Sequence, residues 1–151
     1  MYNYAATLVV NPPGSLALTR EQLWRGLEQK AENPLDFVPG MASCEIVERY
    51  ADGFLREVVL RGDRLRERIT FTPMIQVHFQ RVGIPGWIAN IVSESEAGLL
   101  LTFAFSVSFV GIDVGSPLEQ EMGERMWQNY RKAVETTLAA TRRRVTEGVI
   151  A

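Results

Sequence analysis

The stretch from residue 43 to residue 109 most constrains how this chain can fold, because its apolar residues recur at every second position. Turn signals interrupt this alternation at short intervals, at Ala51-Asp52-Gly53, Gly62-Asp63, Pro73, residues 83–86 and Glu96-Ala97-Gly98. Strands that follow one another as hairpins pair antiparallel. The stretch therefore predicts a six-stranded antiparallel meander, whose apolar face must be covered by another part of the chain.

The N-terminal segment predicts one further strand and then a helix. Residues 4–10 form a short apolar run rich in strand formers, closed by an Asn-Pro-Pro-Gly turn that neither a helix nor a strand can continue. Thr19 and Gln22 have the spacing of a capping box, which begins a helix. This helix is expected to run to about Glu32, because Pro34 stops it.

The C-terminal segment predicts a single long helix. Ser116 is its expected cap, Pro117 takes the first helical position, and Glu119 follows three residues after the cap. Apolar residues then keep helical spacing over roughly 28 residues, a length of about 42 Å. They are Met122, Met126, Tyr130, Val134, Leu138 and Val145. A helix of this length and character is the natural cover for the apolar face of the sheet.

These elements predict an α+β domain spanning residues 1–151. In it, a curved seven-stranded antiparallel sheet wraps around the long C-terminal helix, and a shorter helix follows the first strand. No internal repeat, low-complexity tract or linker divides the chain, so one domain is expected.

Composition removes several classes of partner and compartment. The net charge of −2 is spread over both signs, which gives no field strong enough to gather nucleic acid or an anionic membrane. No apolar run approaches the roughly 20 residues of a membrane helix, so membrane insertion is not expected. Cys44 is the only cysteine, which excludes an internal disulfide and makes a reducing cytoplasm the simplest location.

Two charged residues fall on the apolar face of the predicted sheet. If Gly62 and Asp63 form a two-residue turn, Arg56 and Glu67 become diagonal neighbours on that face. Buried charges are costly unless they are paired. The two residues therefore either form the polar end of a cavity, where Arg56 anchors a carboxylate, phenolate or carbonyl group, or satisfy each other and only fix the register of the sheet.

A three-residue turn at 51–53, with Gly53 left-handed, extends this face to the preceding strand. It places Glu48 opposite Arg56 and adds Tyr50 to the same face. An inward cluster of Glu48, Arg56 and Glu67 is therefore expected.

Large apolar residues are expected to line the rest of the interior. They are Phe71, Phe103 and Phe105 on the strands, and Met126 and Tyr130 on the long helix. A filled core explains such residues, although methionine and phenylalanine also line adaptable pockets. Trp87 and Asn90 follow the loop at 83–86, which could form one lip of a cavity mouth, with residues 34–41 as the other lip. The alternative is an ordinary connection with a packed tryptophan.

The lone histidine and the lone cysteine give no catalytic or metal motif. His78 is expected to point outward, and Cys44 is expected in the core. Neither has a partner at a recognisable spacing, so no metal, cofactor or catalytic residue is assigned.

The order of elements, from strand and helix through six-stranded meander to long helix, resembles the helix-grip fold of the START, birch-pollen-allergen and polyketide-cyclase (SRPBCC) superfamily. Four short strings are similar to a small branch named after a protein of the fungal acetylaranotin gene cluster: Glu32-Asn33-Pro34-Leu35, Phe54-Leu55-Arg56-Glu57, Arg66-Glu67-Arg68 with Pro73 beyond, and Trp87 to Ser93. The resemblance implies a hydrophobic ligand cavity between sheet and helix. Some members of the superfamily bind or carry lipids and hormones, and others cyclise or dehydrate polyketides.

Three functions follow as hypotheses. The first is a binder or carrier of a small hydrophobic molecule with one polar group. The second is a cofactor-free cyclase, dehydratase or isomerase that acts on a polyketide-like substrate, with the Arg56 and Glu67 region polarising a carbonyl. The third is an interaction module whose groove receives a partner's helix or peptide. A strand edge or the long helix could also support a homodimer.

Overall fold

Seven strands form one antiparallel sheet in the order β1-β7-β6-β5-β4-β3-β2, in a computed structural model that describes all 151 residues. The strands are β1 (Tyr2–Val9), β2 (Met41–Tyr50), β3 (Gly53–Leu60), β4 (Asp63–Thr72), β5 (Gln76–Val82), β6 (Gly86–Ser95) and β7 (Gly98–Val107). The first strand returns to pair with the last, and β2 to β7 follow one another as hairpins. The predicted six-stranded meander with an additional first strand is confirmed.

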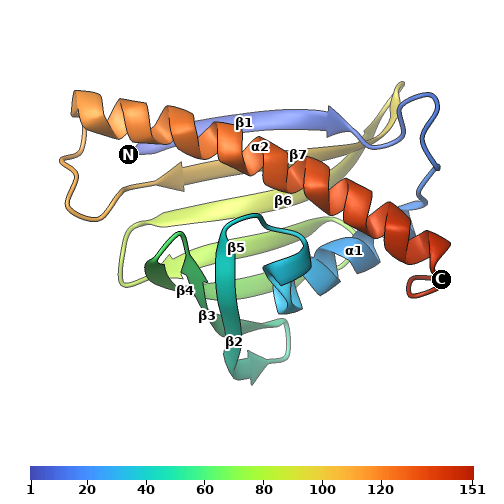
Figure 1. Cartoon of the computed structure of the whole chain (residues 1–151), viewed down its shortest axis with the longest axis horizontal. Helices are drawn as coiled ribbons and strands as arrows, with labels where there is room; N and C mark the ends of the chain where they lie inside the picture. The colour runs from blue at the N-terminus through green and yellow to red at the C-terminus, as the bar shows by residue number, and fades with distance from the viewer.

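The long helix α2 (Pro117–Thr146) lies across the sheet, and α1 (Arg20–Glu32) lies beside its C-terminal part (Figure 1). A short 3-10 turn, η1 (Pro34–Asp36), follows α1. Both predicted helix starts are confirmed, because the Thr19 side chain accepts a hydrogen bond from the Gln22 amide and the Ser116 side chain accepts one from the Glu119 amide. Neither α1 nor α2 combines the length and the apolar character that a membrane-crossing helix requires.

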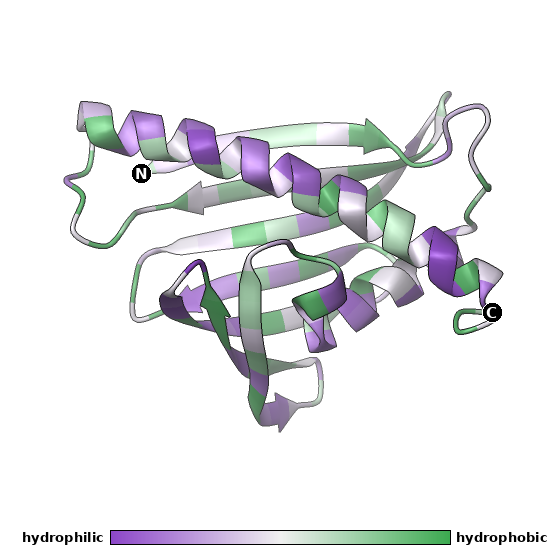
Figure 2. Cartoon of the chain, in the orientation of Figure 1, coloured by the Kyte–Doolittle hydropathy of each residue, from purple (hydrophilic) through white to green (hydrophobic).

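The core lies between the inner face of the sheet and the two helices. Phe103 and Phe105 on β7 are buried and alternate with half-buried residues that face outward. Val134 and Leu138 on α2 pack against the same cluster. Polar and apolar bands alternate along α2, as expected of a helix with one buried side (Figure 2). The sheet and α2 therefore hold each other mainly through buried apolar surface.

The helices approach each other closely at Gly26. A Cβ atom at this position would overlap the Thr141 side chain on α2. Glycine, which normally weakens a helix interior, is therefore required here for packing. This contact brings the C-terminal end of α1, with Lys30, close to the inner face of the sheet.

The turn between β3 and β4 differs from the sequence prediction. Arg61 and Gly62 occupy it with φ of 49° and 85°, and Leu60 pairs with Asp63. Positive φ at both central residues is the hairpin geometry that matches strand twist, and Gly62 adopts it at the second position. The register therefore moves, and Arg56 lies directly opposite Glu67 rather than diagonal to it.

The predicted position of Glu48 is wrong. Tyr50 pairs with Gly53, so the turn has two residues, and the register between β2 and β3 shifts between Ile46 and Glu48. This irregularity places Ile46 opposite Arg56 and leaves Glu48 exposed opposite Leu55. The three-residue turn and the inward three-charge cluster are both absent, because a β-bulge reverses which face the following residues occupy.

Tyr50 also lies outside the core, contrary to prediction. Its side chain is 40% exposed, and its hydroxyl donates a 3.0 Å hydrogen bond to Glu48 Oε2. The Arg68 guanidinium covers its ring at 4.0 Å. The β2–β3 end of the sheet thus carries a surface cluster of polar contacts.

Candidate functional site

Two adjacent cavities lie between the inner face of the sheet and the N-terminal half of α2. The inner pocket has a volume of about 80 Å³, and the more open outer cavity has about 550 Å³. Six residues line both spaces: Leu60, Arg61, Leu65, Arg81, Met126 and Asn129. The two spaces therefore adjoin at these residues.

The outer cavity has mainly apolar walls with cationic residues among them. Leu118, Met122 and Arg125 come from α2, the β3–β4 hairpin contributes Arg64, and the segment after β7 contributes Phe109. Arg64 and Arg125 each pair with a glutamate on the surface, Glu57 and Glu121 respectively. Hydrogen-bond donors for a ligand in the outer cavity must therefore come from residues other than Arg64 and Arg125.

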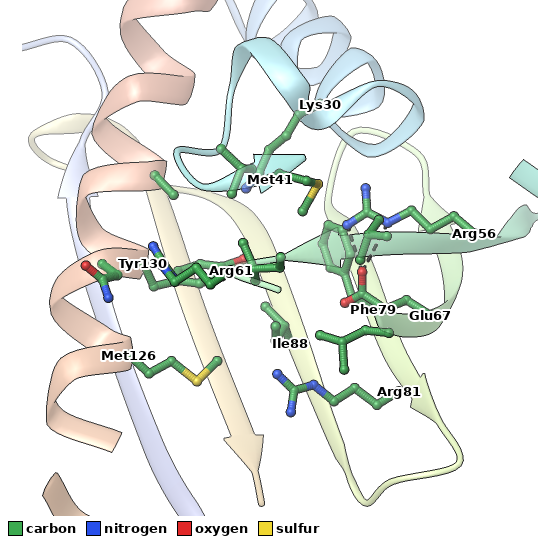
Figure 3. A pocket seen from close by; sticks show the side chains of 16 residues that line it. Lys30, Met41, Arg56, Arg61, Glu67, Phe79, Arg81, Ile88, Met126 and Tyr130 are labelled. Carbon is green, nitrogen blue, oxygen red and sulfur yellow. Dashed lines mark hydrogen bonds and ion pairs between the residues drawn. The ribbon is translucent and has the colours of Figure 1, made fainter. Parts of the chain in front are cut away.

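One wall of the inner pocket is a buried ion pair between β3 and β4 (Figure 3). Arg56 Nε and Nη2 donate to Glu67 Oε1 at 3.1 and 2.9 Å, and Arg56 Nη1 donates to the Ala31 carbonyl at 2.8 Å. Arg56 and Glu67 are only 4% and 5% exposed. The guanidinium thus joins the sheet to the C-terminal end of α1, and each of its three nitrogens has a protein partner.

Lys30 enters the inner pocket from α1. Its Nζ donates a 3.0 Å hydrogen bond to Asn90 Oδ1, and Asn90 Nδ2 donates to the Tyr130 hydroxyl at 3.1 Å. Lys30 takes part in none of the ion pairs of the structure. Burial, reinforced by the charge of Arg56 and opposed by that of Glu67, lowers the pKa of the Lys30 amine to about 7. Burial also raises the pKa of the Tyr130 hydroxyl.

Arg81 stands where the inner pocket meets the outer cavity. Its Nη1 donates a 3.3 Å hydrogen bond to the Ser108 carbonyl, and its buried Nε has no partner. Burial lowers the pKa of this guanidinium, although arginine stays charged at neutral pH. Because Arg81 lines both spaces, its guanidinium is a candidate partner for an anionic or carbonyl oxygen of a bound molecule.

The inner pocket is cationic overall. Lys30, Arg56, Arg61 and Arg81 line it, and Glu67 is the only carboxylate among its lining residues. Its remaining surface is largely apolar: Val38, Met41, Val58, Leu60, Leu65, Phe79, Ile88, Met126 and Ala133. No three histidine, cysteine, aspartate or glutamate side chains in the structure gather closely enough to hold a metal ion.

The structure brings five of the predicted site residues to this region. Arg56, Glu67, Met126 and Tyr130 line the inner pocket, and Asn90 joins Lys30 to Tyr130. Their proposed role in ligand binding stays a prediction. The predicted lip at residues 34–41 reaches the pocket through Val38 and Met41.

Other predicted lining residues belong to the packed core instead. The rings of Phe103 and Phe105 lie behind Tyr130, at centroid distances of 5.3 and 5.9 Å, and neither lines the cavities. Phe71 packs near α1, with its centroid 5.8 Å from that of Phe54 and 6.1 Å from that of Trp24. All three rings therefore pack between elements, with Phe103 and Phe105 buried and Phe71 half-buried.

Trp87, predicted to bind ligand, lines neither cavity, whereas the predicted lip at residues 83–86 reaches the outer cavity through Ile84. Trp87 lies within β6, where Ile88 and Asn90 face inward and Trp87 faces outward, 37% exposed. Its ring stacks on His78 with centroids 5.9 Å apart, on the outer face. The strand begins at Gly86, so period-two alternation places Trp87 and Asn90 on opposite faces.

Lys30 and Arg81 were not predicted as site residues, although the spacing of each in the sequence indicates an inward-facing side chain. Lys30 follows Leu27 by three positions on α1, and residues three apart share a helix face. Arg81 continues the alternation of Val77 and Phe79 on β5, which places it on the inner face.

Comparison with known proteins agrees with the fold. A family model described as acetylaranotin biosynthesis cluster protein L matches residues 4–148. A search of curated proteins found no match. Among solved structures, the di-domain aromatase/cyclase StfQ from the steffimycin biosynthetic pathway superposes with a TM-score of 0.73 at 11% identity, covering 96% of this chain and 52% of StfQ. This chain therefore spans about half the length of StfQ.

Two further structures are similar over nearly their whole lengths. The Zhui aromatase/cyclase from a Streptomyces species has a TM-score of 0.67 at 15% identity, covering 95% of this chain and 93% of that one. Ara h 8.0201 has a TM-score of 0.60 at 12% identity, covering 93% of this chain and 95% of that one. At these identities the similarity shows a shared architecture, the helix-grip fold that the order of elements predicted.

Proposed function

We propose that this chain, which belongs to the acetylaranotin biosynthesis cluster protein L family, binds a small apolar molecule. The molecule bears an anionic or carbonyl head group. One observation carries the proposal: beside an apolar cavity lies a pocket that three arginines, Lys30 and a single carboxylate line. The outer volume of about 550 Å³ suits a small organic molecule, since ligand pockets usually measure about 300–1,000 Å³.

The two spaces suggest separate roles for the two ends of the ligand. The inner pocket, at about 80 Å³, has room for a head group only. Arg81 lines both spaces, and Lys30 lines the inner pocket. A charge-assisted hydrogen bond from Arg81 and a hydrogen bond from the Lys30 amine would fix an oxygen of the head group. The apolar body of the ligand would then lie against Met122 and Phe109 in the outer cavity.

The similar structures favour a polyketide-like ring system as the apolar body. StfQ and Zhui are described as aromatase/cyclases, and both share this helix-grip architecture. A cofactor-free cyclase or dehydratase is therefore the second candidate function. The observation that favours it is the Lys30 amine beside Tyr130, since a group that titrates near neutral pH can move protons. The cavity gives less support to a module for peptide binding, which needs an open groove.

Native mass spectrometry of the purified protein tests the proposal. We expect the protein as purified to carry a species of small mass that is lost on denaturation. Alternatively, protein from which bound molecules have been removed should retain 2-naphthoate in preference to its methyl ester. The ester is the matched control, because it has the same rings but no charge. Equal retention of acid and ester, or of neither, would contradict the cationic head-group site.

A further inference from the structure

The chain uses lysine very sparingly, yet places one in the pocket. It contains two lysines, Lys30 and Lys132, against 14 arginines. Lys132 is exposed on α2, whereas Lys30 is 4% exposed and lines the inner pocket. Arginine stays protonated at any ordinary pH, but a lysine amine can lose its proton and become a nucleophile. Lys30 therefore gives the pocket a chemical ability that its arginines cannot supply.

The contacts of Lys30 leave its amine without a counter-ion. Its hydrogen-bond partner is the Asn90 amide oxygen, and the rings of Tyr130 and Phe79 lie 5.4 and 6.0 Å from Nζ. The nearby carboxylate of Glu67 accepts both of its hydrogen bonds from Arg56. The amine is thus held by a neutral amide and lies near two aromatic rings, with no carboxylate bonded to it.

The charged and titratable groups around Lys30 come from every element that faces the pocket. Arg56 on β3 disfavours a charge on Lys30, Glu67 on β4 favours it, and Tyr130 on α2 is neutral at physiological pH. Arg81 on β5 and Arg61 in the β3–β4 turn also line the pocket. Burial of the amine, with the charge of Arg56, outweighs the opposing charge of Glu67 and lowers the pKa of Lys30 to about 7, so the uncharged amine is well populated at neutral pH.

We propose that Lys30 forms an imine with a ketone or aldehyde group of the bound molecule. The inference deepens the proposed function, on which it rests, by assigning a carbonyl group to the ligand and a covalent step to the pocket. The geometry behind it is a buried, unpaired amine whose partner Asn90 also contacts Tyr130.

The step balances without an oxidant or reductant. The Nζ lone pair adds to the carbonyl carbon while the carbonyl π electrons move to oxygen, and a proton passes from nitrogen to that oxygen. The resulting carbinolamine then loses water as the C=N bond forms. Tyr130 accepts its hydrogen bond from Asn90 Nδ2, so its own O–H remains available to donate to the ligand oxygen. Water is the only leaving molecule, and hydrolysis reverses the reaction.

A small aryl 1,3-diketone tests this inference on the full-length protein. This probe condenses with a reactive amine, releases one water and yields a stable enaminone that absorbs in the near ultraviolet. We expect one equivalent to add at Lys30 at a rate more than about tenfold above that of Lys132. Peptide mapping should show the probe mass less one water on Lys30, and 2-naphthoate should slow the reaction by competition.

Three variants complete the experiment. Lys132→Arg should react as the wild type does, whereas Lys30→Arg and Lys30→Met should lose the fast phase. Circular dichroism establishes that each variant is folded. Equal rates at both lysines would overturn the inference. Binding of the diketone without adduct would also overturn it but leave the proposed function standing, while failure of both 2-naphthoate and diketone to bind would remove both.

Discussion

Arg56 directs two guanidinium nitrogens at one carboxylate oxygen of Glu67, the residue directly opposite it across β3 and β4. Its third nitrogen binds the Ala31 carbonyl near the end of α1. Both side chains are buried. One ion pair thus connects two strands and a helix at the wall of the pocket, which gives it a structural role whether or not a ligand touches it.

Arg56→Met is expected to lower the free energy of unfolding by about 3–5 kcal/mol, because it leaves the Glu67 carboxylate buried and unpaired. The double variant Arg56→Met/Glu67→Met should recover much of this loss, since both charges are then gone. Denaturant unfolding of the two single variants and the double variant gives the coupling energy. Additive effects would mean that the pair is not energetically coupled.

Glu48→Ala is expected to leave both stability and ligand binding unchanged. Glu48 is exposed on the outer side of the β2 irregularity, and the hydroxyl of Tyr50 is its only hydrogen-bond partner. Thermal unfolding and 2-naphthoate titration of this variant, beside Glu67→Ala, check the point. A loss of affinity in Glu48→Ala comparable to that in Glu67→Ala would mean that Glu48 faces the cavity.

Local signals predicted the elements of the fold well. Thr19, Pro34 and Ser116 determine helix boundaries through capping and through the missing proline amide, so they could be read from a few neighbouring residues. The face that carries Arg56 and Glu67 followed from simple alternation, which continues without interruption through β3 and β4.

The exact register between neighbouring strands was harder to predict from the sequence. Gly62 fits either Arg61-Gly62 or Gly62-Asp63 as the turn, and strand twist selects the first. The β2 irregularity beside Val47 interrupts a pattern that looks regular in sequence, because it depends on how β2 pairs with β3. Lys30 was missed for another reason, since its charge suggests a solvent-facing residue although its helix position is inward.

Arg81→Met is expected to weaken binding of 2-naphthoate by about 10- to 100-fold, the usual effect of losing a hydrogen bond from a charged group. Binding of the methyl ester should change much less, because the ester lacks the negative charge. Isothermal titration with both compounds measures the difference. An equal loss for acid and ester would show that Arg81 shapes the cavity without recognising charge.

Lys30 should make stability depend on pH. Its pKa is lowered from 10.5 to about 7 in the folded chain, so between these values the unfolded chain binds more protons than the folded chain. The free energy of unfolding should therefore rise with pH over this window, by up to about 1.4 kcal/mol per pH unit, and the cost of the buried charge is fully present below pH 7.

Denaturant unfolding between pH 6 and about pH 10 measures this dependence. Lys30→Met should flatten the rise, because it removes the titrating group, and Lys132→Met should keep it, because Lys132 is exposed. The same pH slope in the wild type and in Lys30→Met would contradict the buried amine.

The central claim is that the space between the sheet and α2 receives the ligand. Titration of isotope-labelled protein with 2-naphthoate, followed by NMR, locates the binding site directly. We predict that the largest shift changes occur at the methyl groups of Ile88, Met126 and Ala133, which line the inner pocket. Changes concentrated around Trp87 and His78 on the outer face, or no saturable change at all, would contradict the account.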